Sequence, residues 1–389
     1  GAGLIVAALL GVSLQSAVAA PPAGSPAADA KSDYIVVYKD NADVGNEVSA
    51  LKSAKIEIKR QYANVLKGAL VSMTTGQADA LSKRATVDSV SADGPVQATA
   101  TATLKKQDLP TTLWGLDRID QRNLPLSNTF SYTSDGTGVT AFIVDTGINA
   151  SHTEFAGRIL PGQNFAPNAN NATLSSNTDD CAGHGTHVSS TVGGTTFGVA
   201  KNVSIVPVRV LDCNGSGTIS GVISGLNWIA GRDHTAGKEV ANMSLGGAAN
   251  TALDTAVKNL IQKGVQVVVA AGNDSRDACN SSPARVPSAV TVAASDNLDR
   301  LAWFSNYGSC VDIIAPGVDI TGAWIGVSNT ATNTISGTSM ATPHVTGTIA
   351  AALASGKTSA DVLANATPGK IVLPGKAAKT PNKLLFFNY

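Results

Sequence analysis

The chain has 389 residues, of which 43% are hydrophobic and 38 are glycine. It is long enough for two domains, or for one large domain with an appendage, and apolar enough to bury a sizeable core, which excludes a disordered chain. Basic and acidic residues number 28 each, so the formal net charge is zero and gives no electrostatic basis for binding nucleic acid or an anionic membrane surface.

The first 19 residues are apolar and end in the small residues Ala17, Val18 and Ala19. This pattern is typical of a secretory signal peptide whose first residues are missing. A membrane anchor is the alternative, which the short apolar part disfavours because it falls short of a bilayer span. We therefore expect cleavage after Ala19 and a secreted, extracellular protein.

A small α+β unit is expected after a linker rich in proline and alanine at 20–30. Its apolar periodicity predicts the order strand, helix, strand, strand, helix, strand. The expected strands lie at 34–38, 56–58, 69–73 and 87–90, and the expected helices at 46–54 and 75–81.

From Val139 onward, apolar strands alternate with helices. This alternation predicts an α/β fold with a doubly wound, mainly parallel sheet that carries helices on both faces. The expected strands include 139–144, 204–210 and 265–269, and the expected helices include 251–263 and one from near Ser339 through Ala354. We expect Pro343 in or near the first turn of that last helix, where proline is tolerated. In such sheets, ligands bind at the carboxyl ends of the strands.

All four cysteines, Cys181, Cys213, Cys279 and Cys310, lie in this second part. An even number in an exported chain predicts two disulfides, against the alternative of free buried thiols. Four cysteines allow three pairings, and the sequence alone does not choose between them.

Three short segments carry an acid, a histidine and a serine in that chain order: Asp145 within 144–147, His184 within 184–188, and Ser339 within 337–343. A serine hydroxyl is a poor nucleophile unless a base lies within hydrogen-bonding reach, and the base needs an acid to fix its tautomer. The set therefore predicts a serine hydrolase that forms an acyl-enzyme.

The same segments exclude three other classes of catalytic site. A zinc site at His184 and His187 lacks the glutamate between the histidines that zincins use as base. An aspartic peptidase needs two Asp-Thr-Gly segments, and this chain has one. An α/β-hydrolase needs Gly-x-Ser-x-Gly and a different chain order, whereas Ala341 replaces the last glycine and only His344 follows Ser339.

The three segments, and longer strings around Trp114, Val208, Asn242, Ala270, Phe304 and Ile335, resemble the subtilisin superfamily of serine peptidases, and most closely its proteinase K branch. The resemblance implies a secreted endopeptidase that acts on protein and peptide substrates. It implies Asp145 as the orienting acid, His184 rather than His187 as the base, Ser339 as the nucleophile and Asn273 as the oxyanion donor. A catalytically inactive subtilase-like binding protein is the alternative, although no catalytic residue is missing.

The resemblance further implies that substrate binds as an added strand between two exposed edges. The edges would be Gly215, Ser216, Gly217 and Ile219 on one side and Ser244, Leu245 and Gly246 on the other, with Ala270, Ala271 and Gly272 lining the primary pocket. Backbone recognition predicts broad specificity, and the small apolar wall predicts a preference for aliphatic or aromatic side chains before the scissile bond. We expect a monomer.

Disulfides Cys181–Cys213 and Cys279–Cys310 are also implied, as is a structural calcium held by the Asp312 carboxylate and the carbonyls of Pro287 and Ala289. No cofactor is expected for catalysis. Ser189 and Ser190 depart from the Ala-Gly usual in relatives, and we expect activity to survive this change.

The small N-terminal unit resembles the subtilase propeptide, which serves its own peptidase as folding template and inhibitor; an unrelated α+β module is the alternative. The expected organisation is a partial signal peptide at 1–19, linker and propeptide at 20–106 and the catalytic domain at 107–389. The propeptide side places the cleaved bond near Ala100, whereas the distance back from Trp114 places the mature start near Gln107, so the boundary lies between 100 and 107.

Overall fold

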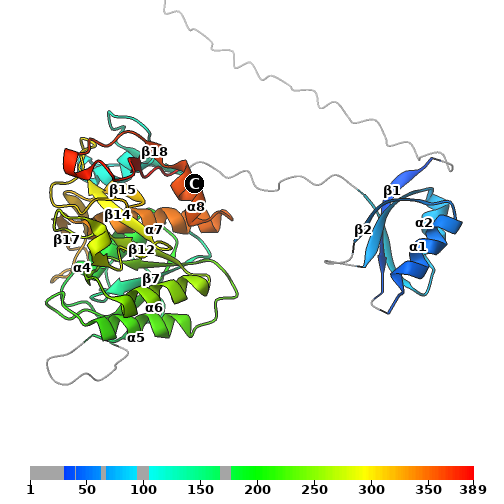
Figure 1. The fold of residues 1–389 in the computed structure, drawn as a ribbon, viewed down its shortest axis with the longest axis horizontal. Helices are drawn as coiled ribbons and strands as arrows, with labels where there is room; N and C mark the ends of the chain where they lie inside the picture. The colour runs from blue at the N-terminus through cyan, green and yellow to red at the C-terminus, as the bar shows by residue number, and fades with distance from the viewer. Residues whose placement is uncertain (1–29, 40, 63–66, 94–104, 167–176) are drawn as a thin grey trace, which may run out of the picture. The chain divides into compact units, whose positions relative to one another are not determined.

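The computed structural model describes residues 30–39, 41–62, 67–93, 105–166 and 177–389 (Figure 1). The chain forms two compact units that divide between Thr101 and Ala102. The expected signal peptide and most of the linker fall outside the described residues. Within the described ranges, no helix is both long enough and apolar enough to cross a membrane.

The N-terminal unit is a four-stranded antiparallel sheet with two helices. Its elements are β1 (Ser32–Tyr38), α1 (Val44–Ser53), β2 (Glu57–Tyr62), β3 (Gly68–Met73), α2 (Thr75–Ser82) and β4 (Val87–Ala92). The strands lie in the order β2-β3-β1-β4, and Val36, Leu51, Val71 and Leu81 are buried between sheet and helices. The expected βαββαβ order is confirmed, and Thr74 begins α2 through a capping box with Gln77.

The second unit is built on a nine-stranded sheet in the order β18-β19-β15-β14-β12-β10-β7-β9-β8, parallel except at β18. Its strands are β7 (Thr140–Asp145), β8 (Gln163–Asn164), β9 (Ser204–Arg209), β10 (Glu239–Met243), β12 (Gln266–Ala270), β14 (Val290–Ser295), β15 (Ile313–Pro316), β18 (Thr367–Pro368) and β19 (Lys383–Leu384). The helices are α3 (Trp114–Ile119), α4 (His184–Gly193), α5 (Ile219–Ala230), α6 (Thr251–Gln262), α7 (Thr338–Ala354) and α8 (Ser359–Asn365).

Shorter elements complete this unit. They are β5 (Lys105–Asp108), β6 (Thr129–Tyr132), β11 (Gly247–Ala248), β13 (Ser281–Ser282), β16 (Ile320–Ala323), β17 (Thr332–Ile335) and the 3-10 turns Thr111–Leu113, Ala278–Asn280 and Gly375–Ala377. The pairs β5–β6, β11–β13 and β16–β17 form separate two-stranded ribbons.

Helices cover both faces of the nine-stranded sheet, as expected. Side chains of β7 alternate: Ala141 and Ile143 face a core shared with α4 and α7, whereas Phe142 and Val144 face a second core shared with α5 and α6. Figure 1 shows α5 and α6 side by side on their face of the sheet. Because all strands from β7 to β15 are parallel, the segments that follow β7, β10 and β12 meet at one edge.

Pro343 lies near the first turn of α7, as expected, but not within it. Helix α7 begins at Thr338, so Pro343 is its sixth residue and lies in the second turn. A proline there leaves the carbonyl four residues earlier, that of Ser339, without its helical donor. The Ser244 hydroxyl donates to this carbonyl at 2.8 Å, so the chain replaces the missing bond from outside the helix.

Candidate active site

Asp145 and His184 lie in direct contact. Asp145 is the last residue of β7 and is fully buried, and His184 is the first residue of α4. The Nδ1 atom of His184 is 2.7 Å from Oδ1 of Asp145, and 28% of the His184 side chain is exposed. Burial alone would lower the pKa of His184, but the charge and hydrogen bond of Asp145, together with the charge of Asp180, outweigh it and raise that pKa.

His187 takes a different position. It is completely buried, its Nε2 atom contacts the Ile320 carbonyl at 3.0 Å, and burial lowers its pKa to about 4. The structure thus places His184, and not His187, beside the acid.

Asp180 caps the start of α4, a role that was not predicted from the sequence motifs. The helix begins after Gly183, which has a φ of 93° and no capping side chain. Asp180 replaces the missing cap, because its Oδ1 accepts from Ala182 N and Gly183 N and its Oδ2 accepts from Thr186 N, all at 2.9 Å. An acidic residue shortly before a helix start is the signal that could have identified it.

Ser339 lies in the first turn of α7 and is partly exposed. Its hydroxyl donates to the Ser244 carbonyl at 3.1 Å, and among the described residues no hydrogen bond joins it to His184. Ser244 is itself fixed, because its own hydroxyl accepts from Asn242 Nδ2 at 2.9 Å. A rotation of the Ser339 side chain is therefore needed before it can reach the imidazole, as is common in structures without substrate.

Asn273 is oriented by the same helix start. Its Oδ1 atom accepts from Thr338 N at 2.8 Å and from Thr338 Oγ1 at 2.9 Å. A backbone N–H can only donate, so this contact fixes which side of the amide is oxygen. The Nδ2 group is consequently left as a donor near Gly337 and Ser339.

Two adjoining hollows connect these groups. The larger, of about 700 Å³, is lined by His184 and by both expected substrate edges, Gly215 to Ile219 and Ser244 to Gly246. The smaller, of about 220 Å³, contains Ser339, Asn273 and the expected wall of Ala270, Ala271 and Gly272. Leu245, Gly246 and Gly247 line both hollows, which makes them one continuous groove.

The chain was compared with known proteins. The model of the subtilase family matches residues 136–368. The chain belongs to the subtilase family. It is therefore a serine endopeptidase.

Individual relatives agree with this subtilase assignment. The chain is 48% identical to the extracellular serine proteinase of Thermus sp. (strain Rt41A), over 91% of this chain and 88% of the relative. It is 49% identical to alkaline serine exoprotease A of Vibrio alginolyticus, over 70% of this chain and 50% of the relative. Among solved structures, a cold-adapted subtilisin-like serine proteinase matches with a TM-score of 0.66 and 49% identity, covering 73% of this chain and all of that one.

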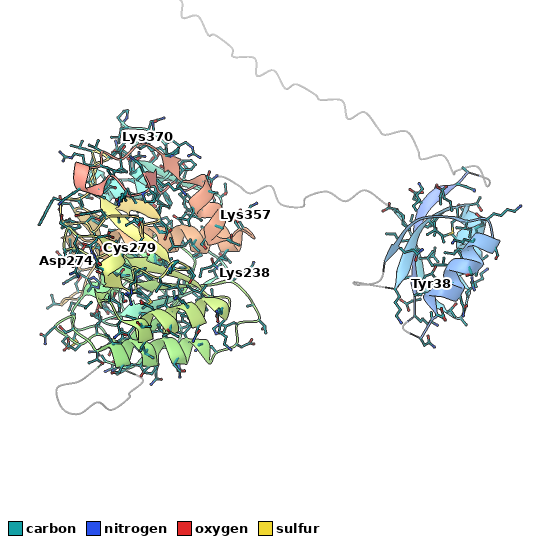
Figure 2. All side chains as sticks on the ribbon, viewed as in Figure 1. Tyr38, Lys238, Asp274, Cys279, Lys357 and Lys370 are labelled. Atoms are coloured by element: carbon teal, nitrogen blue, oxygen red, sulfur yellow. A yellow bond between two sulfur atoms is a disulfide. The ribbon has the colours of Figure 1, made fainter. Side chains whose placement is uncertain are left out.

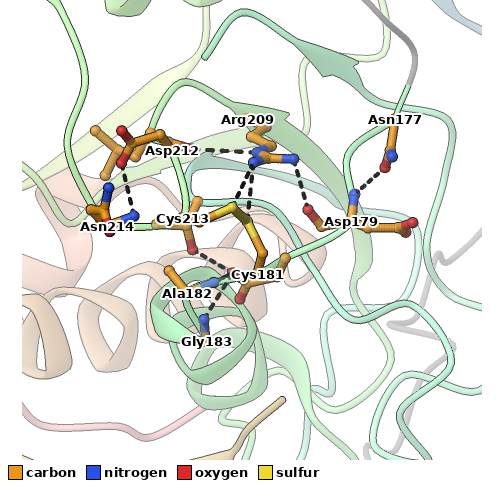
Figure 3. Close-up of a disulfide and its surroundings, with 12 residues drawn as sticks. Asn177, Asp179, Cys181, Ala182, Gly183, Arg209, Asp212, Cys213 and Asn214 are labelled. Carbon is orange, nitrogen blue, oxygen red and sulfur yellow. Dashed lines mark hydrogen bonds between the residues drawn. A yellow bond between two sulfur atoms is a disulfide. The ribbon is translucent and has the colours of Figure 1, made fainter. Parts of the chain in front are cut away.

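The subtilase has two disulfides in the described ranges, Cys181–Cys213 and Cys279–Cys310, which are the pairs that the resemblance implied. Figure 3 shows the first, beside Arg209, whose guanidinium reaches both sulfur atoms and donates to the Asp179 carbonyl at 3.0 Å. This disulfide ties the segment before α4 to Cys213, two residues before Gly215 of the substrate edge.

The subtilase's Asp312 directly precedes β15. Its Oδ2 atom accepts from Thr291 N at 2.8 Å, and burial raises the pKa of its carboxyl. Within the described ranges, no group of three or more His, Cys, Asp or Glu side chains is placed to hold a metal ion. Any cation here would depend on Asp312 and on backbone carbonyls, which residue type does not reveal.

The smaller hollow, which contains Ser339 and is called the primary hollow from here on, is also lined by two charged residues that the sequence did not predict. Asp274 and Arg276 line it beside the expected small residues, with Arg276 Nη2 3.1 Å from Asp274 Oδ2. Both side chains are about half exposed. The sequence motifs gave no indication that these two residues line the hollow.

Proposed function

We propose that Ser339, His184 and Asp145 are the nucleophile, the general base and the orienting acid of a secreted subtilisin-type endopeptidase. The observation that carries this assignment is the 2.7 Å contact between His184 and Asp145 at the groove that also contains Ser339. The match of residues 136–368, which include all three residues, to the subtilase family model supports it.

The proposed reaction begins when Ser339 turns from the Ser244 carbonyl toward His184 and attacks the scissile carbonyl. His184 takes the serine proton as an imidazolium, which the Asp145 carboxylate stabilises, and then gives that proton to the leaving amine. Water then hydrolyses the acyl-enzyme, with His184 again taking and returning the proton. Asn273 Nδ2 and the backbone N–H of Ser339, in the unpaired first turn of α7, donate to the oxyanion.

Substrate polypeptide lies in the groove as an added strand between Gly215–Ile219 and Ser244–Gly246. Its side chain before the scissile bond enters the hollow walled by Ala270, Ala271 and Gly272, which favours aliphatic and aromatic residues. We further propose a broad range of protein substrates, a monomeric enzyme and an extracellular location. The apolar first 19 residues and the Thermus relative, an extracellular proteinase, support that location.

The N-terminal unit is proposed as the intramolecular inhibitor and folding template. Strand β5 pairs with β6 of the second unit from Lys105↔Tyr132 to Asp108↔Thr129. Cleavage near Gln107 would cut this ribbon, so we place the processed bond before Lys105. N-terminal sequencing of the secreted enzyme tests the boundary, and a start beyond Lys105 contradicts it.

A structural calcium is proposed at Asp312 with the carbonyls of Pro287 and Ala289. The donor set is all oxygen, as calcium prefers, and a bound cation would offset the burial that raises the pKa of the Asp312 carboxyl. Calcium would contribute to stability and take no part in the reaction. A calcium-dependent rise in melting temperature, lost in Asp312→Asn, tests this site.

Hydrolysis of casein by the purified protein and by its Ser339→Ala variant tests the proposed function. We expect the variant to fold and to lose activity. Full activity in the variant would contradict the assignment of the nucleophile.

A further inference from the structure

Asn242 is a buried amide in an interior strand of the nine-stranded sheet. Lys238, labelled in Figure 2, directly precedes β10, and Asn242 lies toward the other end of that strand with none of its surface exposed. Val240, two residues earlier on the same face of the strand, packs in the core that contains α7. A polar group is costly to bury at such a place unless it is hydrogen-bonded, so its partners indicate its role.

The partners of Asn242 join β10 to α7 at two points. Its Nδ2 group donates to the Ser244 hydroxyl at 2.9 Å, and this hydroxyl donates to the Ser339 carbonyl at 2.8 Å. Its Oδ1 atom accepts from the Thr346 hydroxyl at 2.8 Å. Thr346 follows Ser339 by about two helical turns, so both ends of this series lie on α7. We call these four residues the Asn242 network.

The direction of each bond in the Asn242 network is fixed by chemistry. A carbonyl can only accept, so the single hydrogen of the Ser244 hydroxyl points to Ser339. The Ser244 oxygen can then only accept, and the NH2 side of the Asn242 amide is the group that can donate to it. This leaves the amide oxygen for Thr346, whose hydroxyl also reaches the Thr342 carbonyl, at 3.1 Å. Asn242 therefore keeps the Ser244 hydrogen directed at the backbone of Ser339.

The Ser339 carbonyl depends on a donor from outside its helix. Side chains donate to three successive carbonyls in the first turn of α7: Thr342 Oγ1 to Thr338 at 2.7 Å, His344 Nδ1 to Met340 at 2.9 Å, and Ser244 Oγ to Ser339 at 2.8 Å. The first two donors belong to α7 itself, whereas Ser244 follows β10. Pro343 lacks the N–H that would otherwise serve the Ser339 carbonyl. The Ser339 hydroxyl in turn donates to the Ser244 carbonyl at 3.1 Å, so Ser244 contacts both the backbone and the side chain of Ser339.

We propose that Asn242 and Thr346 are positioning residues for the nucleophile, because they orient the Ser244 hydroxyl that holds the Ser339 carbonyl. The inference rests on the proposed function. Neither residue touches the substrate or the reacting atoms. Loss of the network should loosen the backbone that places the Ser339 hydroxyl and N–H, which lowers kcat. The Ser244 carbonyl, which belongs to the substrate edge, remains in every variant, so KM should not change.

The test measures kcat and KM on a short peptide anilide, with kcat normalised to the fraction of enzyme that a fluorophosphonate labels. Asn242→Leu keeps the branched shape without polar atoms and should lower kcat ~10-fold, the scale of one hydrogen bond, with KM unchanged. Ser244→Ala should do the same. The double variant should be no slower than Ser244→Ala alone, because Asn242 acts through Ser244.

A matched pair of threonines in α7 separates positioning from packing. Thr346 and Thr348 are both fully buried, but the Thr348 hydroxyl donates to the His344 carbonyl at 2.8 Å, within the helix. Thr346→Val should lower kcat, whereas Thr348→Val should keep the wild-type value. This comparison, together with Ser244→Ala, also tests the network if Asn242→Leu is not secreted.

Losses that add in the double variant, a raised KM at unchanged kcat, or equal kcat values for Thr346→Val and Thr348→Val would overturn the proposal. Activity that survives Ser339→Ala would instead count against the proposed function. An inactive Ser339→Ala beside additive losses would overturn the positioning role alone, which keeps the two failures distinct.

Discussion

The His184 imidazole and the Asp145 carboxylate share one short contact, 2.7 Å between Nδ1 and Oδ1, while Oδ2 of Asp145 is buried with no hydrogen-bond partner among the described residues. The carboxylate therefore depends on His184 and on Thr146 N, which donates to Oδ1, for its stabilisation. A buried charge with so few partners favours the imidazolium strongly.

Asp145→Asn should lower kcat by about 10⁴-fold, because an amide favours the wrong imidazole tautomer. The base must be neutral to act, so the raised pKa of His184 places the acid limb of wild-type kcat/KM above 6.5. Asp145→Asn removes the charge that raises the pKa of His184, while burial still lowers that pKa. The acid limb of the variant's kcat/KM profile should therefore move to lower pH. A pH profile with a peptide anilide checks both effects; an unmoved limb would contradict the coupling.

Asn273→Ala should lower kcat by about 10²- to 10³-fold with little change in KM, a magnitude that rests on the corresponding donor of subtilisin, a member of the same family. Asn273→Asp is the matched control. It retains an acceptor for Thr338 N but lacks the Nδ2 donor, so it should be nearly as slow. Recovery of activity in Asn273→Asp would show that holding Thr338, and not donating to the oxyanion, is what matters.

Ser189 and Ser190 are neighbours in α4, but among the described residues only the Ser190 hydroxyl has hydrogen-bond partners. Ser190 Oγ accepts from Ala323 N at 2.9 Å and donates to the His187 carbonyl at 2.7 Å, whereas Ser189 Oγ is buried with no partner among the described residues. Ser190→Ala should lower the free energy of unfolding by about 1–3 kcal/mol, because it leaves a buried N–H unpaired. Ser189→Ala should leave it unchanged or raise it.

Denaturant unfolding of both variants in a Ser339→Ala background, which prevents self-digestion, measures this contrast. Equal losses in the two variants would contradict it. In the active background, both should keep their activity, as the sequence led us to expect.

The two disulfides close loops of nearly equal length, with sequence separations of 32 and 31. Loop entropy alone then predicts that removing either disulfide lowers the free energy of unfolding by about 4 kcal/mol. The two double variants are Cys181→Ser with Cys213→Ser, and Cys279→Ser with Cys310→Ser. Chemical unfolding of the two double variants in the Ser339→Ala background checks this. A large difference between them would show that local contacts, such as those of Arg209, outweigh the loop term.

Arg276→Ala should change the preference for the residue before the scissile bond. The change leaves the Asp274 carboxylate unpaired at the primary hollow. We expect the ratio of kcat/KM for Lys over Phe at that substrate position to rise ~5-fold, the scale of an exposed ion pair. The double variant with Asp274→Ala should return the ratio to the wild-type value, and an unchanged ratio in the single variant would count against a role for this pair.

Much of the fold could be predicted because local patterns and tertiary structure agree. The apolar run before Asp145 became β7, and the apolar stripe of 251–263 became α6, each within a residue or two of its expected bounds. The proposed site rests on three motifs in order, and the parallel sheet brings the carboxyl ends of its strands to one edge.

What escaped prediction depends on contacts between distant segments. The Ser339 carbonyl, which Pro343 leaves without a helical donor, accepts instead from the hydroxyl of Ser244, far away in the chain. Asp180 caps a helix whose own cap residue is glycine, and Trp303 is exposed where an apolar side chain would be expected to pack inward. No local pattern encodes the Ser244 contact, whereas an acidic residue just before a helix start is a local signal that could have identified Asp180.

The central claim is that Ser339 is the single activated nucleophile of this groove. Labelling the mature enzyme with a fluorophosphonate, followed by peptide mapping, tests it most directly. We predict one adduct, on Ser339, with labelling abolished in Ser339→Ala and slowed in Asp145→Asn. An adduct on another serine that abolishes activity, or full labelling of Ser339→Ala, would contradict it.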